Sequence, residues 1–339
     1  MTERWPELPY ADWKDTRDTL HLWTQVVGKV RLALTPWLNH SWHVALYVTT
    51  RGLTTSPIPW HGGSFQIDFD FVDHVLWVRT SEGHFRQIML KPMSVAEFYE
   101  DVMIALRELG VDVRITTMPN EIADCVPFEQ DTQHAAYTAG FANRFWRVLL
   151  SASEVFAHFR TGFLGKTSPV HFFWGSFDLA VTRFSGGAAP SHPGGVPHLP
   201  NAVAQEAYSH EVSSAGFWPG GGGPVDYAAF YSYAYPAPDG FGAAPVKPQD
   251  AFFSKELGEF LLPYDAVRRA RDPDAALMEF LQSTYGAAAD LAKWDRKTLE
   301  CGLGEKGKVR AALSPLMPAK AGIQFFREEL GPRFRGDER

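Results

Sequence analysis

The segment 168–186, SPVHFFWGSFDLAVTRFSG, constrains the fold of this chain more than any other stretch. Its composition predicts two short strands joined by a tight turn at the central Gly-Ser pair. The strands place His171, Asp178 and Arg183 among phenylalanine and tryptophan side chains. Because burying an unpaired polar group costs about 1–3 kcal/mol, these ionisable groups need partners. We therefore expect the hairpin to contribute to a buried site.

Length and charge limit the kinds of protein that this chain can be. The 339 residues are 45% hydrophobic and 14% aromatic, which is enough for two domains or for one large fold of two lobes. The net charge of −7 gives no basic surface for nucleic acid, so we expect no nucleic-acid partner. Cys125 and Cys301 are isolated in sequence, and we expect neither a disulfide framework nor a metal site from them.

No feature of the sequence directs the chain to a membrane. No apolar run reaches the roughly 18–20 residues of a membrane span. The first residues, MTERWPELPYADWKDTRD, are acidic and polar, whereas a signal peptide needs a basic start and an apolar core. We expect a soluble, cytoplasmic protein that has no membrane partner.

Apolar periodicity predicts a first lobe over residues 1–127. Helical spacing indicates a helix over 12–34, and Ser94 followed by Glu97 forms a capping box that starts a second helix. Strict alternation makes 65–71 the clearest strand. Further strands are expected at 42–49, 75–80, 85–90 and 111–116.

Two polar patterns in this lobe each allow a functional interpretation and a structural one. Asp68 and Asp70 share one face of a strand, where they would bind a metal, act as acid and base, or belong to a solvated surface. His21, Gln25 and Lys29 follow one another at four-residue steps along the first helix. They form either a solvated face or one wall of a cleft.

The second lobe is predicted over residues 128–300. A broadly apolar helix over 141–163 precedes the aromatic hairpin, and a loop rich in Gly, Pro and His follows over 186–201. Strands are expected at 208–217 and 230–235, and helices at 254–271 and 274–294. The fold class is therefore α+β, with two similar lobes that each contain a mostly antiparallel sheet packed with helices. The tripeptide TSP occurs at 55–57 and again at 167–169, which is consistent with an internal duplication.

Strand alternation also predicts where chemistry would gather. If the strands of the second lobe share a sheet, one face collects His171, His210, Tyr231 and Tyr233. Asp178 or Glu211 would lie near its rim. A register shift of one residue would send each set to the other face, so the alternation alone does not fix the site.

We first consider a small-molecule site, since ligand pockets combine aromatic walls with a few convergent polar groups. The expected ligand-binding residues are Trp174, Arg183, Trp218, Tyr231, Tyr233 and, from the first helix, His21, with His171 and His210 as further polar contacts. The guanidinium of Arg183 donates two parallel hydrogen bonds, which favours an anionic or carbonyl-bearing ligand.

Two other interpretations stay open. A metal-dependent or acid–base enzyme would use His171, His210 and Glu211, with Asp178 as a further catalytic candidate. No known metal motif is present, so no metal ligand is assigned and no cofactor is identified. Alternatively, the aromatic groups form a plain core, and the protein is a structural or interaction module. The sequence specifies neither a reaction nor an oligomeric state.

Several long stretches carry a resemblance to a known family. SPVHFFWGSFDLAVTRFSG, AYSHEVSSAGFWPGG and FYSYAYP, with WHVALYVTTRGLTTSPIP and FQIDFDFVDH upstream, resemble a bacterial family of conserved hypothetical proteins. That family is classed as a domain of unknown function, and the resemblance covers about residues 5–300. It implies a single family-length unit but no activity, substrate or site residue.

The end of the chain differs in character from the rest. From about Ser314 the sequence resembles the translated product of a dispersed bacterial intergenic repeat, through MPAKAGIQ and PRFRGDE. We therefore assign 301–339 to a tail, disordered or loosely docked, and do not interpret its basic end as a binding arm.

Overall fold

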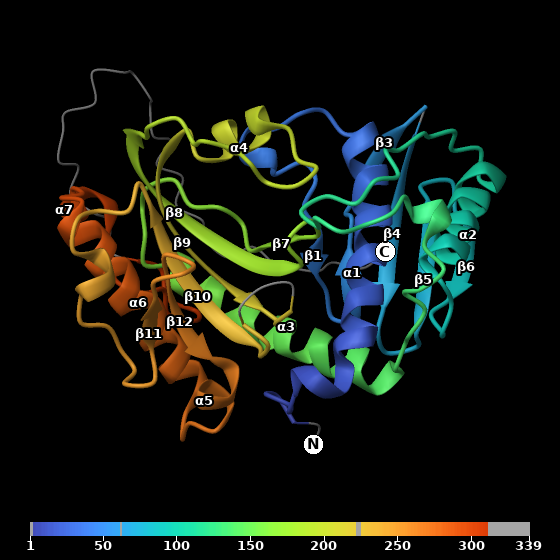
Figure 1. Cartoon of the computed structure of the whole chain (residues 1–339). Helices are drawn as coiled ribbons and strands as arrows, with labels where there is room; N and C mark the ends of the chain where they lie inside the picture. The colour runs from blue at the N-terminus through green and yellow to red at the C-terminus, as the bar shows by residue number, and fades with distance from the viewer. Residues whose placement is uncertain (1–2, 62, 222–224, 311–339) are drawn as a thin grey trace, which may run out of the picture. The chain divides into compact units, whose positions relative to one another are not determined.

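Two antiparallel sheets, each of six strands, organise the described part of the chain (Figure 1). The computed structural model describes residues 3–61, 63–221 and 225–310. Residues up to Leu303 form one compact unit, which is the subject of the following paragraphs. The predicted α+β class is confirmed. Most of the predicted tail, 311–339, lies outside the described residues.

The α-helices of the described residues are α1 (Tyr10–Leu34), α2 (Val95–Glu108), α3 (Ala139–Arg160), α4 (Asn201–Ala207), α5 (Tyr264–Arg268), α6 (Pro273–Leu291) and α7 (Arg296–Leu299). The first sheet contains β1 (Tyr47–Val48), β2 (Gly52–Thr54), β3 (Ile58–Trp60), β4 (Gly63–Asp70), β5 (Val75–Thr80) and β6 (Phe85–Met89). The second contains β7 (His171–Phe173), β8 (Asp178–Ala188), β9 (His210–Trp218), β10 (Ala229–Tyr235), β11 (Phe252–Ser254) and β12 (Glu259–Pro263).

The first sheet buries one face against helices. Its strand order is β1-β2-β4-β5-β6, and β3 pairs with β4 beside β2. The predicted alternation in β4 gives the strand one buried face: Phe65, Ile67 and Phe69 are buried, while the residues between them face outward. On the buried face, Trp23 of α1 stacks on Phe98 of α2, with ring centroids 4.6 Å apart.

The structure contains the capping box predicted at the start of the second helix and gives both aspartates of β4 a partner. The predicted capping box starts α2, since the Glu97 backbone N–H donates to Ser94 Oγ and the Ser94 backbone N–H donates to the Glu97 carboxylate. Asp68 accepts a hydrogen bond from Arg79 at 2.9 Å. Asp70 pairs with Arg51 and accepts two backbone N–H groups of the following turn. Surface pairing and turn formation therefore account for both aspartates.

The second sheet separates a helical face from an open face. Its order is β11-β12-β10-β9-β8-β7, and every neighbouring pair is antiparallel. In Figure 1, α3 and α6 lie on one side of these strands and α4 on the other. Phe217 and Phe230 occupy the helical side, with ring centroids 5.3 Å apart. The opposite side forms the floor of the site described below.

Helix α1 lies between the two sheets (Figure 1). A single antiparallel bridge also joins the two halves of the chain. Leu46, just before β1, exchanges two backbone hydrogen bonds of 2.9 Å with Phe172 of β7. The domain boundaries near residues 127 and 300 stay predictions, as does the internal duplication.

The predicted helix over 254–271 is wrong. The chain forms β11 and β12 there, and only Tyr264–Arg268 is helical. The turn between the strands contains Gly258 with φ +73°, a conformation that suits glycine. The apolar run FLLP is buried along almost its whole length, and such a run does not show by its period whether it is a strand or a helix.

Three shorter predictions also need correction. The strand expected at 111–116 is wrong: Val111 and Val113 are buried in alternation, but their backbone pairs with no strand among the described residues. The strand expected at 42–49 is reduced to Tyr47–Val48. The loop expected at 186–201 begins as the end of β8, and the short helix α4 follows it.

Among the described residues, no helix combines the length and apolar character needed to cross a bilayer.

Candidate functional site

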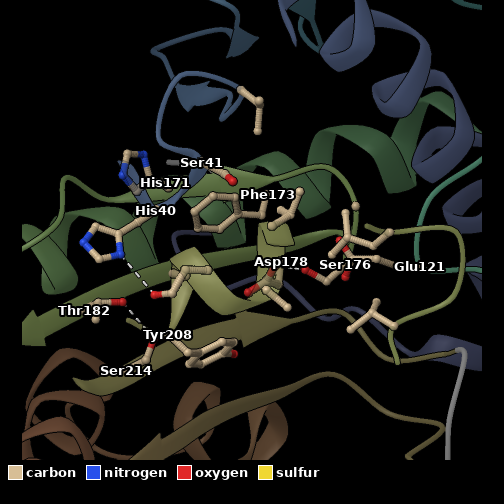
Figure 2. Close-up of a pocket in the computed structure, with 18 of the residues that line it drawn as sticks. His40, Ser41, Glu121, His171, Phe173, Ser176, Asp178, Thr182, Tyr208 and Ser214 are labelled. Atoms are coloured by element: carbon tan, nitrogen blue, oxygen red, sulfur yellow. Dashed lines mark hydrogen bonds between the residues drawn. The ribbon is translucent and has the colours of Figure 1, made fainter. Parts of the chain in front are cut away.

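A cavity of about 740 Å³ lies on the open face of the second sheet. Strands β7 to β10 and β12 form its floor, and α4 with the preceding loop covers it. The segment around His40 closes one end, and Figure 2 shows the side chains that point into the space. Ligand pockets are typically about 300–1,000 Å³, so this volume is appropriate for a small molecule.

The pairing register decides which side chains reach the cavity. His171 pairs with Ala180, Phe173 with Asp178 and Tyr233 with Ser214, so these residues share one face. The cavity-facing residues of the floor include His171, Phe173, Asp178, Ala180, Thr182, Ser214, Tyr231, Tyr233, Glu259 and Leu261. The structure thus brings together four predicted site residues: His171, Asp178, Tyr231 and Tyr233.

Asp178 is the centre of an acidic end of the cavity. Tyr231 Oη donates a hydrogen bond to one carboxylate oxygen, and Ser176 Oγ donates to the other at 2.6 Å. Burial raises the pKa of Asp178, and these two hydrogen bonds only partly offset that effect. No ion pair to Asp178 exists among the described residues.

Glu121 and Glu259 add two carboxyl groups to the same end. Burial and then the nearby Asp178 charge raise the pKa of each to about 7. Glu121 stays exposed to solvent and Glu259 is half-buried, and both line the cavity. Gly175 makes room for Glu121, since a Cβ on this glycine would lie 2.0 Å from Glu121 Oε1.

Three tyrosines extend the acidic end across the floor. Tyr208 and Tyr233 share a hydrogen bond of 3.0 Å between their hydroxyls, and Tyr231 stacks beside Tyr233. Burial raises the pKa of all three phenols, so they act as neutral hydrogen-bonding groups. Tyr231 reaches Asp178 by crossing Gly216, where a Cβ would lie 2.3 Å from its hydroxyl.

The other end of the cavity is built from histidine and aromatic rings (Figure 2). Both ring nitrogens of His171 lack a hydrogen-bond partner, and the residue is 1% exposed. Burial lowers its pKa to about 3, so the ring is neutral. His40 is fully engaged, because Lys166 Nζ donates to its Nε2 at 2.6 Å and its Nδ1 lies 3.0 Å from the Ala207 carbonyl.

Two predicted tryptophans line the cavity. The indole N–H of Trp174 donates to the Val44 carbonyl at 2.8 Å, and the ring lies against Gly28 of α1. Trp218 lines the cavity from the end of β9.

Arg183 lies on the opposite face of the sheet, because five residues separate it from Asp178 on one strand. Its guanidinium donates to the Phe159 carbonyl at 2.5 Å and stacks 4.3 Å from the Tyr285 ring centroid. Burial lowers its pKa to about 10. Arg183 therefore stabilises the helical face, and the reason for expecting an anionic ligand does not apply to this cavity.

The remaining candidates also lie outside the cavity lining. His210 is exposed, and Glu211 accepts a hydrogen bond from Ser185 at 2.6 Å. His21 is buried behind the hairpin turn with Nε2 2.7 Å from the Gly175 carbonyl, and burial lowers its pKa to about 3. Its neighbours on the helix, Gln25 and Lys29, hydrogen-bond to backbone carbonyls, so the polar stripe of α1 is neither solvated nor part of the cavity.

The three residues of the enzyme interpretation are thus not gathered at one point. No group of three His, Cys, Asp or Glu side chains within the described ranges is arranged to hold a metal ion.

Sequence reasoning missed Glu121, Glu259, Tyr208 and His40. Glu259 was placed in a helix, and Glu121 lies in an irregular segment for which no period exists. Tyr208 precedes β9, where α4 ends. No local pattern marks Tyr208 or the two glutamates as site residues.

The fold and the site define an α+β protein whose second antiparallel sheet carries a partly covered aromatic and acidic cavity. The chain belongs to the family of unknown function DUF5996, whose family model matches residues 5–301. This match confirms the resemblance to a domain of unknown function. The comparisons found no matching curated protein and no matching solved structure.

Proposed function

We propose that this protein binds a small molecule in the cavity on the open face of the second sheet. The main support is the cavity itself, with its volume of about 740 Å³. Small-molecule sites are clefts of about 300–1,000 Å³ with mostly apolar and aromatic walls and a few convergent polar groups. This space has such a volume and a lining of aromatic, hydroxyl and carboxyl groups.

The unpaired chemistry of the lining also supports a ligand. His171 is buried without a hydrogen-bond partner, and Asp178 is buried without a cation. Each such group destabilises the folded protein by about 1–3 kcal/mol unless something pairs with it. A bound molecule that contacts both groups would offset these costs.

A thermal-shift screen tests the proposal with the full chain. The panel contains amines, alcohols, carboxylic acids, sugars and nucleotides, and hits are checked by calorimetry. We expect at least one class to raise the melting temperature in a saturable manner, because a ligand that binds only the folded state stabilises it. If no compound in the panel binds, the proposal fails and the structural or interaction interpretation takes precedence.

Two variants of α4 locate the binding. Val203 lines the cavity from the roof, whereas Gln205 is exposed on the same helix. Val203→Trp fills the space and should abolish the thermal shift, while Gln205→Trp should leave it unchanged. Equal shifts in both variants would place the binding elsewhere and contradict the proposal.

Acid–base chemistry on the bound molecule is a second candidate. It is favoured by Glu121 and Glu259, whose pKa values of about 7 suit proton transfer near neutral pH. These residues would replace the originally expected histidines as acid and base. Incubating a confirmed ligand with the protein and analysing it by mass spectrometry and NMR distinguishes turnover from binding. A location in the cytoplasm and a bacterial source stay predictions.

A further inference from the structure

We propose that the cavity recognises an organic cation: an ammonium group at the Asp178 end, an apolar body across the floor, and a hydroxyl or similar hydrogen-bonding group at His171. This inference rests on the proposed small-molecule binding and specifies the class of ligand.

The balance of charge at the Asp178 end is the first reason. Three carboxyl groups, those of Glu121, Asp178 and Glu259, line the cavity, and no lysine or arginine appears among its described lining residues. Their neighbours on β10 and just after α4 are neutral phenols and supply no positive charge. The acidic end therefore lacks the cation that three carboxylates would attract.

The cations of the surrounding elements are engaged elsewhere. Lys29 donates to the Met118 carbonyl and Lys166 to His40, at 2.9 Å and 2.6 Å. Arg17, behind Phe177, pairs with Asp18 at 2.8 Å. Neutral His21 lies behind the hairpin turn. A positive charge at the carboxyl end must then come with the ligand.

His171 provides a second and independent reason. It is 1% exposed, and its two nitrogens have neither a partner nor accessible surface. The residue lines the cavity from β7, so a rotation of the side chain would bring a nitrogen to the ligand. A neutral imidazole offers one donor and one acceptor, which a hydroxyl group can satisfy. Figure 2 shows His171 with His40 and Ser41 at one end, away from Asp178, Ser176 and Glu121. The two unsatisfied regions are therefore separate, and one ligand would contact both.

The surface between the two ends is apolar or aromatic. Its lining includes Phe173, Phe184, Leu199, Val203 and Leu261. The hydroxyls of Thr182 and Ser214 also line the floor and hydrogen-bond to each other at 2.9 Å. An alkyl or aryl body removes this surface from water, at about 25 cal/mol for each Å² buried. The tyrosine rings near Asp178 also favour a cation through their π faces.

Proton linkage follows from the same arrangement. Burial and the nearby Asp178 charge raise the pKa of Glu121 and Glu259 to about 7, and an ammonium group would favour their ionised forms. Binding of a cation should therefore release protons and become tighter as the pH rises from about 5.5 to 8. A neutral ligand should show neither effect.

Calorimetric titration with linear amino alcohols tests the inference. The matched probes are the diol, which lacks the cation, and the alkylamine, which lacks the hydroxyl, each at the same chain length. We expect the amino alcohol to bind at least tenfold more tightly than the diol, because hydrogen bonds to charged groups contribute about 1.5–3 kcal/mol. Heats measured in buffers of different ionisation enthalpy report the released protons.

Isosteric variants assign the two ends. Glu259→Gln should weaken amino-alcohol binding tenfold or more, whereas Glu211→Gln makes the same change on the same sheet outside the cavity and should have no effect. His171→Phe should weaken binding of the amino alcohol about tenfold but leave the alkylamine unchanged.

The inference is overturned if the diol binds as tightly as the amino alcohol, or if Glu259→Gln leaves the affinity unaltered. Either result leaves the proposed function intact, provided that Val203→Trp abolishes the binding. Failure of every compound in the broad screen would instead remove the proposed function itself.

Discussion

The two sheets have the same number of strands and the same antiparallel pairing. They differ in the partners of the acidic side chains on the faces that do not pack against helices. On the first sheet, Asp68 pairs with Arg79, whose guanidinium also stacks 4.5 Å from the Trp77 ring centroid. On the second, Asp178 is covered by α4 and its loop and has no cationic partner. A sheet face open to solvent needs only local pairing, whereas the face beneath α4 leaves a buried carboxyl group whose described side-chain hydrogen bonds all come from hydroxyl groups.

A comparison within the second sheet leads to the same conclusion. Arg183 and Asp178 are buried on one strand, but the helical face surrounds Arg183 with rings and a carbonyl acceptor. The cavity face leaves Asp178 with hydroxyl donors and two further carboxyl groups. Burial alone therefore does not indicate a ligand site. Arg183 Nε also lacks a hydrogen-bond partner, but Arg183 is packed among aromatic rings, whereas Asp178 borders a space that a ligand could occupy.

The largest expected effect concerns packing on the helical face. Phe230→Ala removes a fully buried ring and should lower the free energy of unfolding by about 3–5 kcal/mol. Tyr233→Phe, on the cavity face of the same strand, should change it by less than about 1 kcal/mol, since it removes one hydrogen bond beside an open space. Urea denaturation of both variants provides the measurement. Equal losses would show that the cavity face is packed as a core.

The next effect is on the pH dependence of stability. The pKa of Glu259 rises from an ordinary 4.5 to about 7 on folding, so the folded state holds its proton longer than the unfolded chain. Stability should therefore fall as the pH rises from about 4.5 to about 7, and Glu259→Gln should reduce this fall by about 1–2 kcal/mol.

His21 and His171 have the opposite effect on the pH dependence of stability. Because folding lowers the pKa of each to about 3, the protein loses stability as the pH falls below about 6.5. Their contribution is the same in both proteins and cancels in the difference. Parallel stability curves for wild type and Glu259→Gln between pH 4.5 and 7 would contradict the buried acidic end.

The smallest effect is expected on the solvated face of the first sheet. Asp68→Asn breaks a pair with Arg79, whose side chain is 49% exposed. Exposed pairs contribute about 0–1 kcal/mol, so chemical denaturation should show a loss below about 0.5 kcal/mol. A loss comparable to that of Phe230→Ala would remove the distinction between the two sheets.

The sequence allowed much of the fold to be predicted, because several elements carry strong local signals. The alternation in β4, the capping box of α2 and the turn of the β7–β8 hairpin each depend on neighbouring residues. The helix predicted over 254–271 failed for the opposite reason, since FLLP is nearly continuous in burial and lacks a period.

The site was less accessible to sequence reasoning. The expected ligand contact Arg183 lies on the face opposite Asp178, and alternation alone could not show which face would be covered by helices. Glu121 and Glu259 come from segments far apart in the chain and reach the cavity through tertiary contacts. Their roles follow from the arrangement of the loop and the sheet, which no short-range pattern specifies.

The contact of Trp174 with Gly28 limits how wide a bound molecule can be at this wall of the cavity. A Cβ on Gly28 would lie 2.2 Å from Trp174 Nε1, so the indole lies directly against the backbone of α1. Its N–H is also held by the Val44 carbonyl. A molecule that is too wide at this wall would clash with the indole ring, which has no free volume behind it. Moving the ring away would require movement of the 25-residue helix α1. We therefore expect branched or bulky molecules to bind poorly on this side. Any adjustment of the cavity to the shape of a ligand would come from α4 and its preceding loop.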